Sequence, residues 1–216
     1  MAELDLLRAL PRTKRNIEKR QEAKDPEVIR IAKEYGEKYF DGPRAYGYGG
    51  YSYDGRWVPV AADIIKHFDL KPGARVLDVG CAKGFLVKDL CAQGMDAFGV
   101  DISEYALIHC SPEIVGRLHL GTALNLPFPD DSFDCVLSLN TIHNFKRSDA
   151  ITAMQEIQRL SGGAAFVQVD SYHTPEQKEI FESWVLTAEF CDYPEGWVAM
   201  FEAAGYTGDY YWTIID

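Results

Sequence analysis

Apolar residues in the first third of the chain follow helical spacing, with one interruption. Residues 1–40 carry them at helical intervals, which predicts an N-terminal helical region. Asp25 followed by Pro26 is typical of a helix start, because the carboxylate caps the first turn and proline fits its first position. Residues 41–57 are rich in glycine and tyrosine and predict an ordered loop. Helical spacing returns over residues 58–68.

From residue 75 onward, short apolar runs alternate with longer amphipathic stretches. The apolar runs predict strands over residues 75–79, 97–100, 118–120, 133–139, 164–169 and 206–215. The amphipathic stretches predict helices over residues 85–93, 103–110, 149–160, 175–189 and 196–204. This alternation predicts an α/β fold with a doubly wound, mostly parallel sheet and helices on both faces.

A turn of small residues separates the first strand from the helix that follows it, in the run RVLDVGCAKGFL. Gly80, Ala82 and Gly84 allow the backbone to approach a ligand, and the helix N-terminus presents amides to it. The spacing is G-x-A-x-G, whereas dinucleotide sites have G-x-G-x-x-G. The carboxylate of Asp78 would repel a pyrophosphate and suits a cationic group such as an ammonium. A nicotinamide-dependent oxidoreductase is therefore the less favoured interpretation.

Asp101 ends the second strand, in the run GVDIS. It lies at about the distance downstream at which an acidic residue binds ribose hydroxyls in nucleotide-binding βαβ units. The small-residue turn and this acid, in strand–turn–helix–strand order, predict a site for a nucleoside with a cationic substituent.

Residues 73–145 resemble a class I S-adenosylmethionine-dependent methyltransferase. VLDVGCAKG and GVDIS match the first two motifs of that family, and LHLGTALNLPFPDDSFDCV resembles its third and fourth. The resemblance implies a Rossmann-like methyltransferase domain over residues 58–216, preceded by an N-terminal helical extension and a lid loop over residues 1–57. It also implies S-adenosylmethionine as cofactor, S-adenosylhomocysteine as product and an enzyme that transfers a methyl group by in-line displacement.

The resemblance also assigns residues to the parts of the cofactor. It implies a binding set of Asp78, Gly80, Ala82, Gly84 and Asn140 toward the methionine, Asp101 on the ribose, and Ile102, Ala123 and Leu124 around the adenine. The chain departs from the family in two places. Thr122 stands where the family usually has aspartate, and only eleven residues follow Gly205, so we expect the usual antiparallel seventh strand to be short or missing.

Aromatic residues dominate the loop before the domain, at Tyr46, Tyr48, Tyr51, Tyr53 and Trp57. One interpretation is a lid over residues 43–57 that excludes water and holds a sulfonium against aromatic faces, with Tyr51 at the cofactor. The other is a packed surface loop. Arg56 either pairs with the methionine carboxylate or a substrate anion, or is a surface arginine.

His143 follows the fourth strand, in the run NTIHNF. The carboxyl ends of strands face the ligand crevice in open α/β sheets. A histidine there can remove a proton from a hydroxyl acceptor, so His143 is the candidate catalytic base. The alternative is a histidine that shapes the pocket without proton transfer. His173 is a second candidate base.

Net charge and motif content narrow the choice of acceptor. The formal charge is −11, which disfavours binding to a phosphate backbone. The run after the fourth strand lacks the N/D-P-P-Y/F motif of enzymes that methylate DNA amines. We therefore expect a small polar acceptor, such as a sugar or related metabolite, and no DNA. Two alternatives stay open: an RNA or protein methyltransferase, and a subunit that binds cofactor without catalysing transfer.

The acidic chain contains one basic segment, which bears on those alternatives. Its members crowd the N-terminal region: Arg8, Arg12, Lys14, Arg15, Lys19, Arg20 and Lys24. The simpler interpretation is a solvated helix face. The other is a surface that contacts an anionic partner or docks an RNA or protein target.

Other sequence features indicate the cellular setting. No apolar stretch reaches the length of a membrane span, and the N-terminus lacks the order of a secretory signal. We therefore expect a cytoplasmic protein that does not enter a membrane. The five cysteines are scattered and the histidines lack H-x-x-x-H spacing, which predicts neither disulfides nor a metal site.

Overall fold

A six-stranded, all-parallel sheet forms the centre of the molecule, in the order β3-β2-β1-β4-β5-β6. The computed structural model describes residues 1–11 and 15–215. The strands are β1 (Arg75–Val79), β2 (Asp96–Asp101), β3 (Leu118–Leu120), β4 (Cys135–Leu139), β5 (Ala165–Ser171) and β6 (Asp209–Ile214). The central strands are apolar on both sides because helices cover both faces of a parallel sheet. The predicted doubly wound α/β fold is confirmed.

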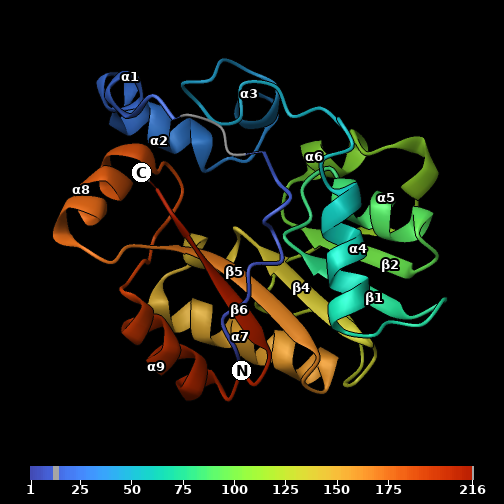
Figure 1. Cartoon of the computed structure of the whole chain (residues 1–216). Coiled ribbons are helices and arrows are strands. Elements are labelled where there is room, and N and C mark those ends of the chain that lie inside the picture. Colours follow the sequence, from blue (N-terminus) through green and yellow to red (C-terminus); the bar gives the residue numbers. More distant parts are fainter. Residues whose placement is uncertain (12–14, 216) are drawn as a thin grey trace.

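Helices cover the two faces of the sheet and the end at which the carboxyl ends of its strands lie (Figure 1). They are α1 (Ile17–Ala23), α2 (Pro26–Ala32), α3 (Glu37–Phe40), α4 (Val58–His67), α5 (Phe85–Ala92), α6 (Glu104–Ile108), α7 (Arg147–Ser161), α8 (Pro175–Trp184) and α9 (Pro194–Ala204), with short 3₁₀ turns η1 (Pro112–Ile114) and η2 (Ile142–Asn144). α4 and α5 bury one apolar core against the sheet, and α7 and α9 bury the other. None of the described helices is long and apolar enough to cross a bilayer.

The first ten residues do not form the predicted helix. The Leu4 amide donates to the Tyr210 carbonyl at 2.8 Å, and the Tyr210 amide donates to the Ala2 carbonyl at 3.0 Å. This segment therefore lies along β6, where it provides partners for an edge that would otherwise be open. Its leucines explain the misleading spacing, because Leu6 is buried against the sheet.

The C-terminal end of the sheet also differs from the usual family pattern. β6 runs parallel to β5, and no antiparallel seventh strand occurs among residues 1–11 and 15–215. The backbone of residues 2–4 lies on the outer side of β6 instead. A short or missing seventh strand was expected from the few residues after Gly205.

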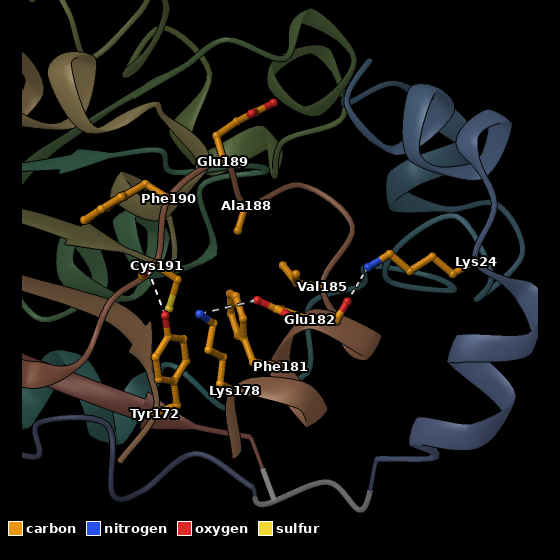
Figure 2. Close-up of a pocket in the computed structure, with 10 residues that line it drawn as sticks. All are labelled: Lys24, Tyr172, Lys178, Phe181, Glu182, Val185, Ala188, Glu189, Phe190 and Cys191. Carbon is orange, nitrogen blue, oxygen red and sulfur yellow. Dashed lines mark hydrogen bonds and ion pairs between the residues drawn. The ribbon is translucent and has the colours of Figure 1, made fainter. Parts of the chain in front are cut away.

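The N-terminal helices lie beyond the carboxyl ends of the strands, as Figure 1 shows for α1, α2 and α3. The predicted cap of α2 is present: the Asp25 carboxylate accepts a hydrogen bond from the Val28 amide at 2.8 Å. α1 packs on α8, and the Lys24 ammonium donates to the main-chain carbonyl of Glu182 at 2.5 Å (Figure 2). The helical extension therefore forms a cap over the edge of the sheet that carries the predicted site.

Candidate active site

The small-residue turn after β1 adopts left-handed backbone angles at three positions. The angle φ is +84° at Gly80, +50° at Ala82 and +70° at Gly84. Such angles are uncommon for a residue with a side chain, so Ala82 needs an external restraint. The Asp101 carboxylate supplies it by accepting a hydrogen bond from the Ala82 amide at 2.7 Å. The structure thus brings together the two motifs that the sequence analysis combined.

Asp101 is fixed from both sides. Its second oxygen accepts a hydrogen bond from the Ser103 amide at 2.8 Å. Burial raises the pKa of Asp101, and the amides of Ser103 and Ala82 oppose that rise. Each oxygen keeps a lone pair beyond these bonds, so the carboxylate can still accept hydrogen bonds from ribose hydroxyls.

Asp78 lies near the end of β1, and its carboxyl group has no hydrogen-bond donor among the described residues. Its side chain is 5% exposed. Burial, with a further contribution from the charge of Asp101, raises the pKa of Asp78 to about 7. A buried carboxylate without a partner is costly, and a cationic ligand would offset that cost. The residues present therefore fit the ammonium group of S-adenosylmethionine.

Glycine is required at position 80 by packing inside the protein, whereas the sequence predicted close approach of a ligand. A Cβ atom at this position would lie 1.9 Å from the Thr141 Oγ1 and 2.7 Å from the Thr141 Cβ. The chain's own turn after β4 occupies the space that the sequence analysis reserved for a ligand. Gly80 is therefore needed for internal packing, whatever its part in binding.

The residues predicted around the adenine gather at the ends of β2 and β3. Ile102 is 62% exposed, which is unusual for isoleucine and leaves an apolar surface for a flat ring. Ala123 is buried and Leu124 half-buried. Thr122, at the family's aspartate position, accepts a hydrogen bond from the Leu124 amide at 3.3 Å.

The tyrosine-rich loop lies closed over the glycine turn. The Lys83 ammonium forms an ion pair with Asp41 at 2.6 Å and donates to the Tyr51 carbonyl at 2.9 Å. The Tyr51 ring stacks on Phe85 with centroids 4.8 Å apart. Burial and the charge of Asp78 both raise the pKa of Tyr51. Lys83 and Asp41 were missed, although Lys83 lies inside the glycine motif.

Arg56 already has an anionic partner within the loop. Its guanidinium bonds both oxygens of Asp54, at 2.9 Å from Nε and 2.5 Å from Nη2. It also lines the cavity described next. Its side chain is 45% exposed, as the surface interpretation expects, and its pairing with a methionine carboxylate or a substrate anion stays a prediction.

A cavity of about 590 Å³ lies between the carboxyl edge of the sheet and the N-terminal cap, and we call it the edge cavity. Tyr51, Phe85 and Asn140 line its side toward the glycine turn. Its other lining residues include His143 and Asp170 from the sheet edge, Arg15, Arg20 and Arg44 from the N-terminal region, and Trp184 from α8. The predicted site residues Asn140, His143, Tyr51 and Arg56 therefore meet in one space.

His143 lines this cavity but is poorly arranged to act as a base. It is 4% exposed, and its Nδ1 accepts a hydrogen bond from the Asp170 amide at 3.1 Å. An amide can only donate, so the neutral ring carries its proton on Nε2. Burial lowers the pKa of His143, and the charge of Asp170 opposes that shift. The lone pair that a base needs therefore faces the backbone.

Asp170 is the cavity residue that the sequence analysis overlooked. One oxygen lies 4.0 Å from the His143 Nδ1, and burial raises the pKa of the Asp170 carboxyl. Its position at the end of β5 was a usable signal, because strand ends face the ligand crevice. His173, the second candidate base, is exposed and does not line the edge cavity.

The sequence and fold match known proteins. A family model described as a methyltransferase domain matches residues 77–191. The uncharacterized methyltransferase YcgJ of Bacillus subtilis (strain 168) is 33% identical over 126 residues, which are 55% of this chain and 49% of YcgJ. Its crystal structure has a TM-score of 0.57 at 25% identity, over 67% of this chain and 66% of that one.

Two further matches broaden the comparison. The demethylmenaquinone methyltransferase of Corynebacterium glutamicum (strain R) is 28% identical over 51% of this chain and 46% of its own length. A phosphoethanolamine N-methyltransferase of Haemonchus contortus, solved with phosphomonomethylethanolamine and S-adenosylhomocysteine, has a TM-score of 0.55 at 20% identity, covering 80% of this chain and 41% of that one. The latter shows the fold alone. The chain spans about half the length of the curated relatives it matches.

The contact at Gly80 predicts a specific loss of stability. Gly80→Ala and Gly94→Ala both place a side chain at a similar positive φ, +84° and +89°, but nothing lies within 4 Å of a Cβ at Gly94. Each change costs about 1–2 kcal/mol for the backbone angle, and Gly80→Ala costs about 1–3 kcal/mol more for overpacking against Thr141. Urea unfolding measures both. Equal losses would show that Thr141 moves away without cost.

The buried charge of Asp78 predicts that stability and binding respond oppositely to Asp78→Asn. The native pKa is about 7 against a reference of 3.8, so the native state binds the proton more tightly and wild-type stability falls as pH rises through that window. The variant escapes this loss, so its ligand-free form should be the more stable one above pH 7, with the difference shrinking toward pH 4. Its affinity for S-adenosylmethionine should fall about tenfold or more, the scale of a lost charge-assisted hydrogen bond.

Urea unfolding between pH 4 and 8 and calorimetric titration measure the two effects. Asp69→Asn is the control, because it removes the same charge from a side chain that is 84% exposed. Unchanged cofactor affinity in Asp78→Asn would remove Asp78 from the binding site.

Proposed function

The chain belongs to the methyltransferase domain family, as its motifs predicted, and from this premise we propose that it transfers a methyl group from S-adenosylmethionine to a small polar acceptor bound in the edge cavity. S-adenosylmethionine is the cofactor of this family and supplies, when bound, a methyl group already activated on a sulfonium. The observation that carries the proposal is the position of the edge cavity, which reaches Phe85, directly after the glycine turn, and Asn140, directly after β4.

The chain's own residues would bind and orient the cofactor. In our proposal Asp78 pairs with the ammonium group and Asp101 accepts the ribose hydroxyls. Ile102, with Ala123 and Leu124, covers the adenine. Orientation supplies much of the rate of such a transfer, since the leaving group needs no further activation.

Proton removal from the acceptor is the second task, and we assign it to Asp170. This carboxylate lines the edge cavity, and its raised pKa makes it a better base than an exposed aspartate. His143 keeps its neutral form and positions the acceptor. This replaces the base role expected for His143, because its accepting nitrogen already receives the Asp170 amide.

The alternatives receive less support. An RNA or protein target was expected to dock on the basic N-terminal segment, but three of its side chains have internal contacts. Arg20 is buried at the edge cavity, Arg8 pairs with Asp63, and Lys24 bonds α8. Arg12 and Lys14 lie outside the described residues. A purely supporting subunit would not need a lined cavity beside its cofactor turn.

Direct binding and turnover experiments test the proposal. Calorimetric titration should show saturable binding of S-adenosylmethionine and none of NAD. Release of S-adenosylhomocysteine in the presence of a small polar acceptor would then establish transfer. Binding of NAD alone would instead favour an oxidoreductase, and cofactor binding without turnover on any acceptor would favour the subunit alternative.

The two cavity residues predict unequal effects on turnover. Asp170→Asn should lower the rate of S-adenosylhomocysteine release by about 10²-fold or more, the range of general base catalysis, when the acceptor is a hydroxyl compound. His143→Ala should lower it less, and neither should change cofactor affinity by more than about twofold. A larger loss for His143→Ala would return the base role to that residue. Full turnover in both variants would leave a mechanism of positioning alone.

The closed loop predicts a measurable opening. We propose that residues 43–57 act as the lid, anchored by the ion pair between Lys83 and Asp41. Lys83→Met leaves Asp41 without its charge partner, so proteolysis within the loop should become several-fold faster, whereas Lys71→Met at an exposed pair should change nothing. Saturating S-adenosylmethionine should slow cleavage in the wild type. Identical cleavage with and without cofactor would contradict the lid.

A further inference from the structure

Three arginines surround one indole ring at the wall of the edge cavity. The guanidinium carbons of Arg15, Arg20 and Arg44 lie 5.8, 4.8 and 5.3 Å from the ring centroid of Trp184. All four residues line the cavity, and Arg20 is only 7% exposed. We call the three arginines the arginine cluster. In the sequence, Arg15 and Arg20 stand out only as parts of a basic segment.

Within the described part of the chain no carboxylate forms an ion pair with this cluster, although the charge of Arg15 does act on Asp170 across the same cavity. Five other arginines of the described residues do form ion pairs, in the pairs Arg8–Asp63, Arg30–Glu27, Arg56–Asp54, Arg117–Asp96 and Arg159–Glu156. Acidic residues outnumber basic ones by 33 to 22 in this protein. Unpaired guanidinium groups at a cavity wall are therefore not the result of a shortage of acids.

The cluster keeps hydrogen-bond donors beyond those that the protein uses. Arg20 donates to the Ala45 and Gly47 carbonyls at 2.9 and 3.2 Å. Arg44 uses one nitrogen for the carbonyls of Gly47 and Tyr48, at 2.5 and 3.3 Å. A guanidinium has five donors, so each of these side chains retains three. The planar fork of such donors matches the oxygens of a carboxylate or a phosphate.

Repulsion among the three guanidinium groups lowers the stability of the ligand-free protein, and a bound anion would remove this effect. Burial, followed by the charge of Arg44, lowers the pKa of Arg20. Burial also lowers the pKa of Arg44. Tyr48 opposes this shift, and the charge of Arg15 adds to it. Arg20 is buried, Arg15 half-buried and Arg44 exposed, so the cost falls mainly on Arg20. Like charges held close to it destabilise the ligand-free protein, and a bound anion would reverse this.

A neighbouring hollow of about 340 Å³ provides the contrast (Figure 2). It lies beside α8, and its charged side chains are satisfied. Lys24 donates to the Glu182 carbonyl, Lys178 lies 3.9 Å from the Glu182 carboxylate, and Glu189 pairs with Lys33. Three of the four charged side chains of that hollow lie near an opposite charge, in the pairs Lys178–Glu182 and Glu189–Lys33, whereas Arg20 and Arg44 bond only neutral carbonyls.

We propose that the arginine cluster binds an anionic group, a carboxylate or a phosphate, of the methyl acceptor, so that the acceptor is an acidic small molecule. The identification of this molecule as the acceptor rests on the proposed function; the anion site itself does not. Asp170 lines the same cavity, and the charge of Arg15 lowers its pKa against the effect of burial. The cluster therefore holds the anionic end while the reacting atom lies toward Asn140, His143 and Asp170.

Small probes test the anion site without knowledge of the acceptor. The melting temperature of the full chain is measured against acetate, inorganic phosphate and neutral acetamide, at constant ionic strength. A saturable rise with acetate or with phosphate, and none with acetamide, is expected; the tighter of the two anions identifies the chemical class. No saturable rise with either anion would overturn the proposal and leave the arginines as braces of the loop.

Variants locate the binding. Arg44→Gln and Arg15→Gln should each weaken the anion by about tenfold or more, as expected for a lost charge-assisted hydrogen bond. Lys19→Gln is the matched control, because it removes one positive charge from an exposed position on the same helix as Arg20. An equal effect of Lys19→Gln would mean a diffuse response to charge and would overturn the proposal. The wild-type comparison of acetate with acetamide stays decisive if an arginine variant fails to fold.

Titration with S-adenosylmethionine in the same variants separates this inference from the proposed function. The cluster variants should keep cofactor affinity while losing the anion. Cofactor binding without anion binding would overturn only the anion site. Anion binding without cofactor binding would leave the site standing and overturn the methyltransferase proposal.

Discussion

The hydrogen bond from the Ala82 amide to the Asp101 carboxylate holds the site together. It spans 19 residues at 2.7 Å and joins the turn after β1 to the end of β2. A left-handed alanine would otherwise relax toward more common angles. Lys83 follows directly, and its position lets it form the ion pair with Asp41 that closes the tyrosine loop. One backbone contact thus sets both the shape of the turn and the anchor of the loop above it.

Much of the fold and part of the site could be predicted from the sequence. Alternating apolar runs identified the parallel sheet, and the glycine turn with Asp101 identified the family. Both signals could be recognised because each consists of residues that are close together in the sequence. The first ten residues misled, since leucines that pack along β6 have the same spacing as a helix face. The tautomer of His143 depends on an amide 27 residues away. The arginine cluster depends on α1, the residue before its cap and a loop, which all meet at the indole ring of α8. Contacts between residues so far apart in the chain cannot be predicted from local sequence patterns.

The molecule carries one acidic and one basic group of side chains toward the carboxyl ends of its strands. Asp78 and Asp101 form an acidic end beneath the tyrosine loop, and the arginine cluster forms a basic wall on the edge cavity. Each end is costly when left unpaired, because burial removes water from charges of the same sign. These unpaired charges lower the stability of the ligand-free protein. In return, a cationic ligand group could bind the acidic residues and an anionic one the arginine cluster, each in a fixed orientation.

The pairing of residues 2–4 with β6 has a consequence for how the protein is made. The two partners are about two hundred positions apart, as the bond from the Ala2 amide to Asp209 shows with its separation of 207. During synthesis the first segment leaves the ribosome long before its partner strand exists, and contacts of such high sequence separation form late. The outer side of β6 therefore gains its partner only after nearly all of the residues between the two segments have been synthesised.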